Sequence, residues 1–265
     1  MRCNQSCCAI KAVHHTCVNN ACLTLLGKAK SVLFQIEGVT GLSVMYDWMH
    51  CKHLGSDQYA FGAVMFLLTF HILRDTAEEN VLAIWKMIKK YYNDHKTPVQ
   101  YQHLDKVSFF LKRGETIPKL RGKAAQILHL GKPLHHVWLC CSNPSLHVHR
   151  QIGLFLKANI HLETILAEHR MEYRLPDSAA TSFKQCTFAM LQIQQALAHH
   201  FALQGLKLFN MTTKCHFLCH MAILAKHINP SKTYCYRGEE FMHISRGLAE
   251  SCVKGLDAAS VSQKM

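Results

Sequence analysis

The sequence predicts a mainly α-helical protein, in which a helical domain is joined to an incomplete piece of a mixed α/β fold. Long segments carry apolar residues at helical spacing and follow helix-start signals, whereas strand-like patterns are confined to residues 31–46. With 265 residues, of which 49% are hydrophobic, the chain is long enough to bury a substantial core. We therefore expect an ordered protein with five or more helices.

Charge and cysteine content indicate which kind of partner and which cellular environment to expect. The chain has 30 lysines and arginines against 17 acids, a formal net charge of +13, which favours polyanionic partners, nucleic acid first. Thirteen cysteines in a chain of this length, without a secretory signal, are expected to be reduced and intracellular. The most apolar window, residues 61–73, is too short to cross a hydrocarbon layer of about 30 Å, so we expect no transmembrane helix.

Residues 1–30 form a cysteine-rich leader. A zinc site would need two close pairs of ligands separated by a loop. The cysteines here are irregularly spaced, at Cys3, Cys7, Cys8, Cys17 and Cys22. We interpret the leader as a poorly specified, partly helical segment, with a zinc site as the alternative.

Residues 31–75 are predicted to form a strand, a turn and a buried helix. The alternation of Leu42, Val44 and Tyr46 indicates a short strand that ends at Asp47, and the apolar segment 58–73 indicates a buried helix. Asp47 stands three residues before His50. This pair is either a helix cap with a first-turn residue or a pair of polar groups mounted at a strand end for chemistry.

Residues 76–208 are predicted to be a helical, insertion-like region. Thr76 and Glu79 have the spacing of a capping box, and the helix that follows should expose its lysines. A shorter helical stretch is expected over 104–111, a turn over 131–133, and two long helices over 147–170 and 177–208.

Residues 209–255 should contain two further helices, followed by a tail at 256–265. In the first helix, two cysteines and two histidines are each four residues apart, and each pair shares a face: Cys215, His216, Cys219 and His220. Neighbouring residues on a helix point about 100° apart, so all four cannot converge on one zinc ion. We prefer a buried helix with one polar edge and keep zinc as the alternative.

The last helix is expected to begin at Glu239 and Glu240 and to end near Val253. Carboxylates in the first turn interact favourably with the helix dipole. This interaction alone is a sufficient reason for two glutamates at this position.

Three of these segments, in this order, resemble the C-terminal part of a cut-and-paste DNA transposase of the DDE, RNase H-like class. The nearest group is the CACTA (En/Spm-like) group. The resemblance covers about residues 40–255 and rests on Asp47-Trp48-Met49-His50 with Leu54-Gly55, on Lys214-Cys215-His216-Phe217-Leu218-Cys219-His220, and on Glu239-Glu240-Phe241-Met242.

The resemblance implies roles for single residues. Glu239 would be the third metal-binding carboxylate, with Glu240 as the alternative in register, while Asp47 and His50 would form the accessory D-x-x-H element. His216 and His220 would lie on a helix near the site. The implied reaction is phosphoryl transfer with Mg²⁺ ions held by three carboxylates, and the implied location is the nucleus.

The chain departs from this family in one respect. The family's first two catalytic aspartates lie upstream of the D-x-x-H element, but the only acid before Asp47 is Glu37. We therefore expect a truncated or decayed transposase-derived protein that does not cleave DNA and retains non-specific DNA binding. The alternative is a helical protein-interaction or scaffold module with no nucleic-acid role.

Overall fold

The structure is a computed structural model that describes residues 36–37 and 46–253. The chain divides into two units, Met1–Tyr46 and Asp47–Met265. Within the described residues all regular structure is helical and no strand is present, in agreement with the predicted mainly α class. The elements are η4 (Met49–Ser56), α3 (Asp57–Leu67), η5 (Leu68–Ile72), α4 (Ala77–Asp94), η6 (Val107–Phe109), α5 (Ala124–Cys141), α6 (His147–Glu168), α7 (Asp177–Ala202), α8 (Thr213–Leu224), η7 (Pro230–Thr233) and α9 (Tyr236–Val253).

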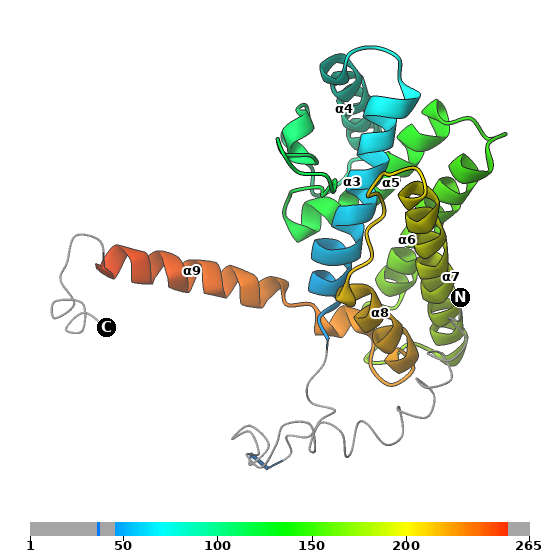
Figure 1. Ribbon diagram of the computed structural model, residues 1–265. Coiled ribbons are helices and arrows are strands. Elements are labelled where there is room, and N and C mark those ends of the chain that lie inside the picture. Colours follow the sequence, from blue (N-terminus) through cyan, green and yellow to red (C-terminus); the bar gives the residue numbers. More distant parts are fainter. Residues whose placement is uncertain (1–35, 38–45, 254–265) are drawn as a thin grey trace. The chain divides into compact units, whose positions relative to one another are not determined.

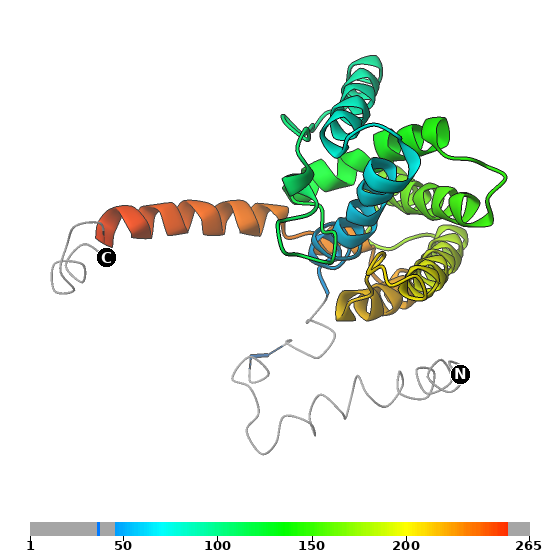
Figure 2. The ribbon, with the colours of Figure 1, turned by 45° about the horizontal axis from the view of Figure 1, so that its top comes forward.

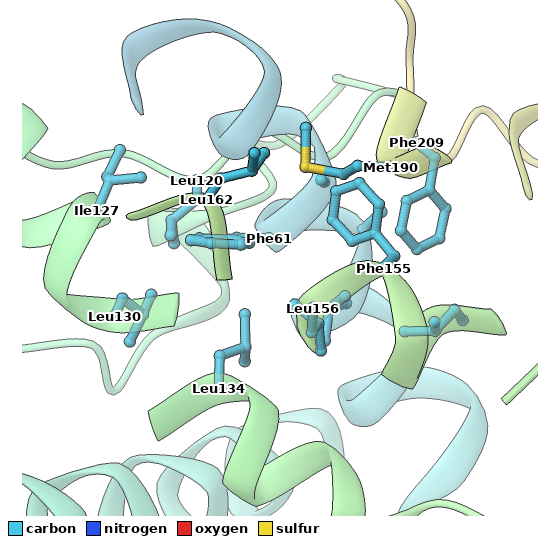
Figure 3. Packing of buried hydrophobic residues seen from close by; sticks show 14 of the residues in the cluster. Phe61, Leu120, Ile127, Leu130, Leu134, Phe155, Leu156, Leu162, Met190 and Phe209 are labelled. Atoms are coloured by element: carbon cyan, nitrogen blue, oxygen red, sulfur yellow. The ribbon is translucent and has the colours of Figure 1, made fainter. Parts of the chain in front are cut away.

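One hydrophobic core joins the elements from η4 to α8. Its buried side chains lie between Trp48 and Ala225. Figure 3 shows Phe61 of α3 lying among leucines of α5 and α6, and Phe155 of α6 lying between Met190 and Phe209. Helices α6 and α7 run side by side (Figures 1 and 2). No helix in the described part of the chain is long and apolar enough to cross a membrane.

Local sequence signals account for helix α4. Thr76 accepts a hydrogen bond from the Glu79 backbone, and the Glu79 side chain in turn accepts one from the Thr76 backbone, which is the predicted capping box. Val81, Ile84 and Ile88 are fully buried, while the lysines of the opposite face are exposed. The amphipathic pattern therefore correctly predicts which face of this helix is buried.

Two predicted boundaries inside the helical region are wrong. The expected turn at 131–133 lies within helix α5, because buried side chains on both sides of Pro133 continue the same core-facing stripe. The helix expected over 104–111 is reduced to η6, because the carbonyl groups of Phe109 and Phe110 accept hydrogen bonds from Arg121 and Lys119, at 2.9 and 2.7 Å. These bonds join two parts of a loop instead of successive helical turns.

Helix ends also differ from the sequence prediction. Helix α7 stops at Ala202 and not near 208, because the chain turns through Gly205, whose φ of +75° lies in the left-handed region that favours glycine. Helix α9 begins at Tyr236, three residues before the predicted start at Glu239. Both differences are at helix ends, where sequence signals are weakest.

The strand and turn predicted around Asp47 are replaced, where the structure describes them, by a helical start. Leu42 and Val44 lie outside the described residues, and so does the cysteine-rich leader 1–30, while Tyr46 belongs to no regular element. From Met49 to Ser56 the chain forms a π-helical turn with a kink at Leu54. Nothing in the described part confirms an RNase H-like sheet.

Candidate functional site

Asp47 and His50 lie together at the start of this π-helical turn. One oxygen of the Asp47 carboxylate accepts a hydrogen bond from the Met49 backbone at 2.9 Å, and the other contacts Nδ1 of His50. The Asp47 side chain is 14% exposed and the His50 side chain 43% exposed. The contact to Met49 is the one expected for a helix cap, and the same carboxylate also contacts His50.

The π-helical turn packs against helix α8, so two of the three motif segments meet in space. Nζ of Lys214 donates a hydrogen bond to the carbonyl oxygen of Leu54 at 2.9 Å. A Cβ atom on Gly55 would lie 2.7 Å from Cδ of Lys214 and 3.0 Å from the His50 carbonyl oxygen, so glycine favours this close approach. The Leu54-Gly55 pair therefore has a packing role.

Polar side chains from η4, α3 and α6 meet beside this turn. We call them the Lys52 cluster: Lys52, His53, Asp57, Asn159 and Glu163. Nζ of Lys52 lies 2.8 Å from Asp57 and 2.9 Å from Glu163. Nε2 of His53 lies 3.0 Å from the same Glu163 oxygen, and Asn159 donates to Asp57 at 2.6 Å. Lys52 and His53 are completely buried.

The charges of this cluster stabilise one another. Burial alone would raise the pKa of Glu163, but Lys52 and His53 outweigh it and hold that pKa well below its usual range. Burial alone would lower the pKa of Lys52, but Asp57 and Glu163 outweigh it and raise it. Lys52 and Glu163 are therefore both ionised and form an ion pair inside the core.

The start of helix α9 reaches the Lys52 cluster. The hydroxyl group of Tyr236 lies 2.9 Å from Nδ1 of His53, and Nε1 of Trp48 donates to Glu163 at 3.2 Å. The backbone of Glu239 and Glu240, the fourth and fifth residues of α9, lies just after its first turn, but their side chains are outside the described residues. The roles implied for these two glutamates therefore stay predictions.

Asp47, Asp57 and Glu163 do not fit a magnesium site. Mg²⁺ requires oxygen ligands around an open position. The Lys52 ammonium group stands between Asp57 and Glu163, in the place that a shared cation would take, and the Asp47 carboxylate is engaged by Met49 and His50. We therefore derive no metal-dependent step from these residues.

The four residues considered as zinc ligands lie on different faces of helix α8. Nε2 of His216 lies 2.8 Å from Nε2 of His220, so this pair shares a face as expected. Cys215 is buried and its pKa is raised by burial, whereas His216 is exposed, and Cys219 packs partly against the core. In the described part of the chain no three His, Cys, Asp or Glu side chains are placed to hold a metal ion.

A strongly basic surface lies elsewhere, on the second half of α4 (86–94) and residues 95–123, which we call the basic end. Between Lys86 and Lys123 there are ten lysines and arginines against three acids, a net charge of +7 out of +13 for the whole chain. Arg121 pairs with Glu115 at 3.3 Å, and we find no other ion pair of these basic residues within the described ranges. Nine are exposed: Lys86, Lys89, Lys90, Lys96, Lys106, Lys112, Arg113, Lys119 and Lys123.

The basic end is held firmly to the rest of the unit. The chain from 95 to 123 follows α4 and lies beside α3 (Figures 1 and 2). Leu120 donates a backbone hydrogen bond to Gln58 of α3 at 2.8 Å. A Cβ atom on Gly62 would lie 2.9 Å from the backbone nitrogens of Lys119 and Leu120, so the loop passes as close as a glycine allows. Its charges are therefore presented on a fixed backbone.

Comparisons of this chain with protein-family models, with curated proteins and with solved structures find no match. The transposase resemblance therefore rests on its short motifs alone.

The Lys52 cluster and the concentration of charge at the basic end were not predicted from the sequence. One signal for the cluster was present: Asn159 and Glu163 are four residues apart on the apolar side of α6, where polar residues are unexpected. A running charge sum would have located the basic end, because seven of the thirteen net charges fall within residues 86–123.

Proposed function

We propose that this chain binds nucleic acid, with duplex DNA as the first candidate, by placing the basic end against the phosphate backbone. The observation that supports this most strongly is the net charge of +7 between Lys86 and Lys123, with nine of the ten basic side chains exposed. Lysine and arginine neutralise phosphates and release condensed counterions, which makes such binding favourable and sensitive to salt.

The proposed binding is non-specific in sequence. Phosphate contacts fix position but do not read bases, and most of the exposed basic residues are lysines, which act as point charges. Helix α4 exposes Lys86, Lys89 and Lys90 on one face, three and four residues apart, so the three ammonium groups can follow one phosphate strand.

We further propose that the protein derives from a transposase and does not cleave DNA. This rests on the motif resemblance and on the Lys52 cluster, in which the ammonium group of Lys52 is paired with both Asp57 and Glu163. Nuclear location is part of this proposal and rests on the same resemblance.

The binding test compares two triple variants of the full chain. In the first, Lys86, Lys89 and Lys90 become glutamine. In the matched control, three exposed lysines outside the basic end become glutamine, so the net charge changes equally: Lys157, Lys184 and Lys207. Fluorescence anisotropy with a labelled DNA duplex is recorded between about 50 and 200 mM salt.

We expect the first variant to bind more weakly and to lower the slope of log affinity against log salt by about 2.7, or about 0.9 for each lost phosphate contact. The control should stay close to the wild type. Equal loss in both variants would show that only net charge matters, and indifference of the wild type to DNA would reject the proposal.

A nicking assay tests the proposed lack of cleavage. Wild type and Glu239→Ala are incubated with supercoiled plasmid in Mg²⁺ or Mn²⁺. We expect neither protein to nick it. Metal-dependent nicking that the substitution abolishes would show that the chain is an active nuclease or transposase.

A helical protein-interaction module is the second candidate function. Helix α9 exposes large apolar side chains at positions i, i+3 and i+7, namely Phe241, Ile244 and Leu248, which are 68%, 55% and 63% exposed. Such a stripe is typical of a helix that packs against another protein. Indifference to DNA, together with self-association or partner binding that Ile244→Ser removes, would favour this function.

A further inference from the structure

We propose that a histidine-lined cavity, separate from the basic end, binds a small apolar molecule that carries a carboxylate group. The cavity has a volume of about 390 Å³ and lies between η5, the start of α6 and the end of α7. Its four histidines come from all three elements: His71, His147, His149 and His200.

The chemistry of the wall is unusual for this protein. Apart from the histidines and Gln204, every residue that lines the cavity is apolar, and none is a lysine, arginine, aspartate or glutamate. Although the chain has 30 lysines and arginines, the main polar group of this wall is imidazole. A ligand that fits it has an apolar body and a polar group that imidazole can recognise.

His149 is oriented as a hydrogen-bond donor. The Asn143 backbone donates to Nδ1 of His149 at 3.0 Å, so in the neutral ring the proton is on Nε2. The ring also packs edge-on against Trp138, whose Nε1 donates to the His149 carbonyl oxygen at 3.0 Å. Burial lowers the pKa of His149, which favours the neutral ring with this donor.

His200 also has one ring nitrogen engaged by the protein. Nε2 of His200 lies 2.8 Å from Nε2 of Gln204, and the His200 ring packs edge-on against Phe201. The remaining nitrogen, Nδ1, is the one left to carry the proton in the neutral ring. Two imidazole N–H groups in one cavity suit an oxygen acceptor.

A carboxylate explains these donors better than a metal ion does. A metal needs the unprotonated nitrogen of imidazole, which His149 uses to accept from Asn143. In the part of the chain described, no three His, Cys, Asp or Glu side chains lie close enough together to hold a metal ion. A carboxylate instead accepts N–H groups in charge-assisted hydrogen bonds, which are about twice as strong as neutral ones.

The volume limits the size of the ligand. Water takes about 30 Å³ per molecule in the liquid, so a cavity of about 390 Å³ holds roughly a dozen non-hydrogen atoms. A fatty acid of medium chain length has this size. Octanoate is therefore a suitable probe, and 1-octanol is its neutral counterpart with the same chain.

The test measures binding of octanoate and of 1-octanol to the full chain by titration calorimetry. The test variant is His71→Leu with His147→Leu, because both side chains are exposed at the rim and their replacement should not disturb folding. The control variant is His136→Leu with His161→Leu, two exposed histidines that do not line the cavity. Thermal unfolding confirms that both variants are folded.

A second variant, His200→Leu, tests a side chain deeper in the wall. We expect octanoate to bind the wild type with one-to-one stoichiometry and at least about tenfold more tightly than 1-octanol, because only the carboxylate forms charge-assisted hydrogen bonds. The rim variant and His200→Leu should each weaken octanoate binding without weakening that of 1-octanol, and the control should change neither.

Three results would overturn the proposal: no saturable octanoate binding, equal affinity for octanoate and 1-octanol, or equal effects of the rim and control variants. DNA binding is measured in parallel. Loss of octanoate binding with unchanged DNA binding would show that the two sites are independent, since the cavity and the basic end share no residue.

Discussion

Lys52 and Glu163 form an ion pair of 2.9 Å inside the core, although Lys52 belongs to the π-helical turn and Glu163 to the middle of helix α6. The Lys52 side chain has no exposed surface and that of Glu163 is 16% exposed. Removing two charges from water is costly, and the cost is offset only when each ion keeps its partners. The pair therefore makes the packing of the 47–57 segment on α6 dependent on both residues.

Replacing Lys52 by methionine should strongly destabilise the protein. The substitution keeps the length of the side chain but leaves the Asp57 and Glu163 carboxylates without their ammonium partner, which costs about 3–5 kcal/mol. Urea unfolding followed by circular dichroism measures the change. The control is Lys86→Met on the exposed face of α4, for which we expect a change within about 0.5 kcal/mol. A loss below about 1 kcal/mol for Lys52→Met would contradict the buried pairing.

The Glu163 carboxylate should make the protein less stable in acid. Its pKa is lower in the folded state than in the unfolded chain, where glutamate titrates near 4.3, so the unfolded chain takes up the proton first as pH falls. The stabilisation is therefore complete above about pH 5 and is lost as pH falls through the lower, folded-state pKa.

Glu163→Gln should consequently be less stable than the wild type at neutral pH and lose less stability on acidification. Urea unfolding at several pH values between about 7 and 3 measures this difference. Glu168→Gln, at an exposed position of the same helix, is the control. Parallel pH curves for wild type and Glu163→Gln would show that Glu163 carries none of the acid sensitivity.

The sequence predicts those features that depend on near neighbours. The capping box of Thr76 and Glu79 and the buried face of α4 follow from residues at most a few positions apart. The Lys52 cluster cannot be predicted in this way, because the burial of Lys52 depends on Glu163. A local sequence pattern cannot connect these two residues. Pro133 shows the opposite error: a strong local turn signal is overridden because the buried stripe of α5 continues past it.

Thr76→Ala should remove the cap of helix α4 and cost about 1 kcal/mol. The Thr76 hydroxyl accepts the Glu79 backbone N–H at 3.3 Å and donates to the Glu79 carboxylate at 2.7 Å. Hydrogen bonds from the Thr76 hydroxyl and the Thr76 backbone N–H lower the pKa of the Glu79 carboxyl group. Thermal unfolding compares Thr76→Ala with Ser178→Ala, an exposed first-turn residue of α7. Equal effects would show that the cap contributes nothing specific.

Gly122→Ala should damage both the stability and the proposed DNA binding, because Gly122 holds the loop of the basic end in place. Its φ of +156° is rarely adopted by other residues, and an added Cβ would lie 2.1 Å from the hydroxyl oxygen of Tyr101. That hydroxyl donates to the carbonyl oxygen of Arg121 at 2.8 Å, so the clash would break a bond that fastens the loop. We expect a loss of about 2–3 kcal/mol.

Gly114→Ala is the matched control for this prediction. Gly114 is in the same loop and has a φ of +84°, but an added Cβ would meet no atom within 4 Å, so only the backbone cost of about 1 kcal/mol applies. Urea unfolding and DNA anisotropy are measured on both variants. A larger loss for Gly122→Ala in both measurements supports a loop held by Tyr101. Equal losses would mean that backbone conformation alone decides, and that Tyr101 does not position the basic end.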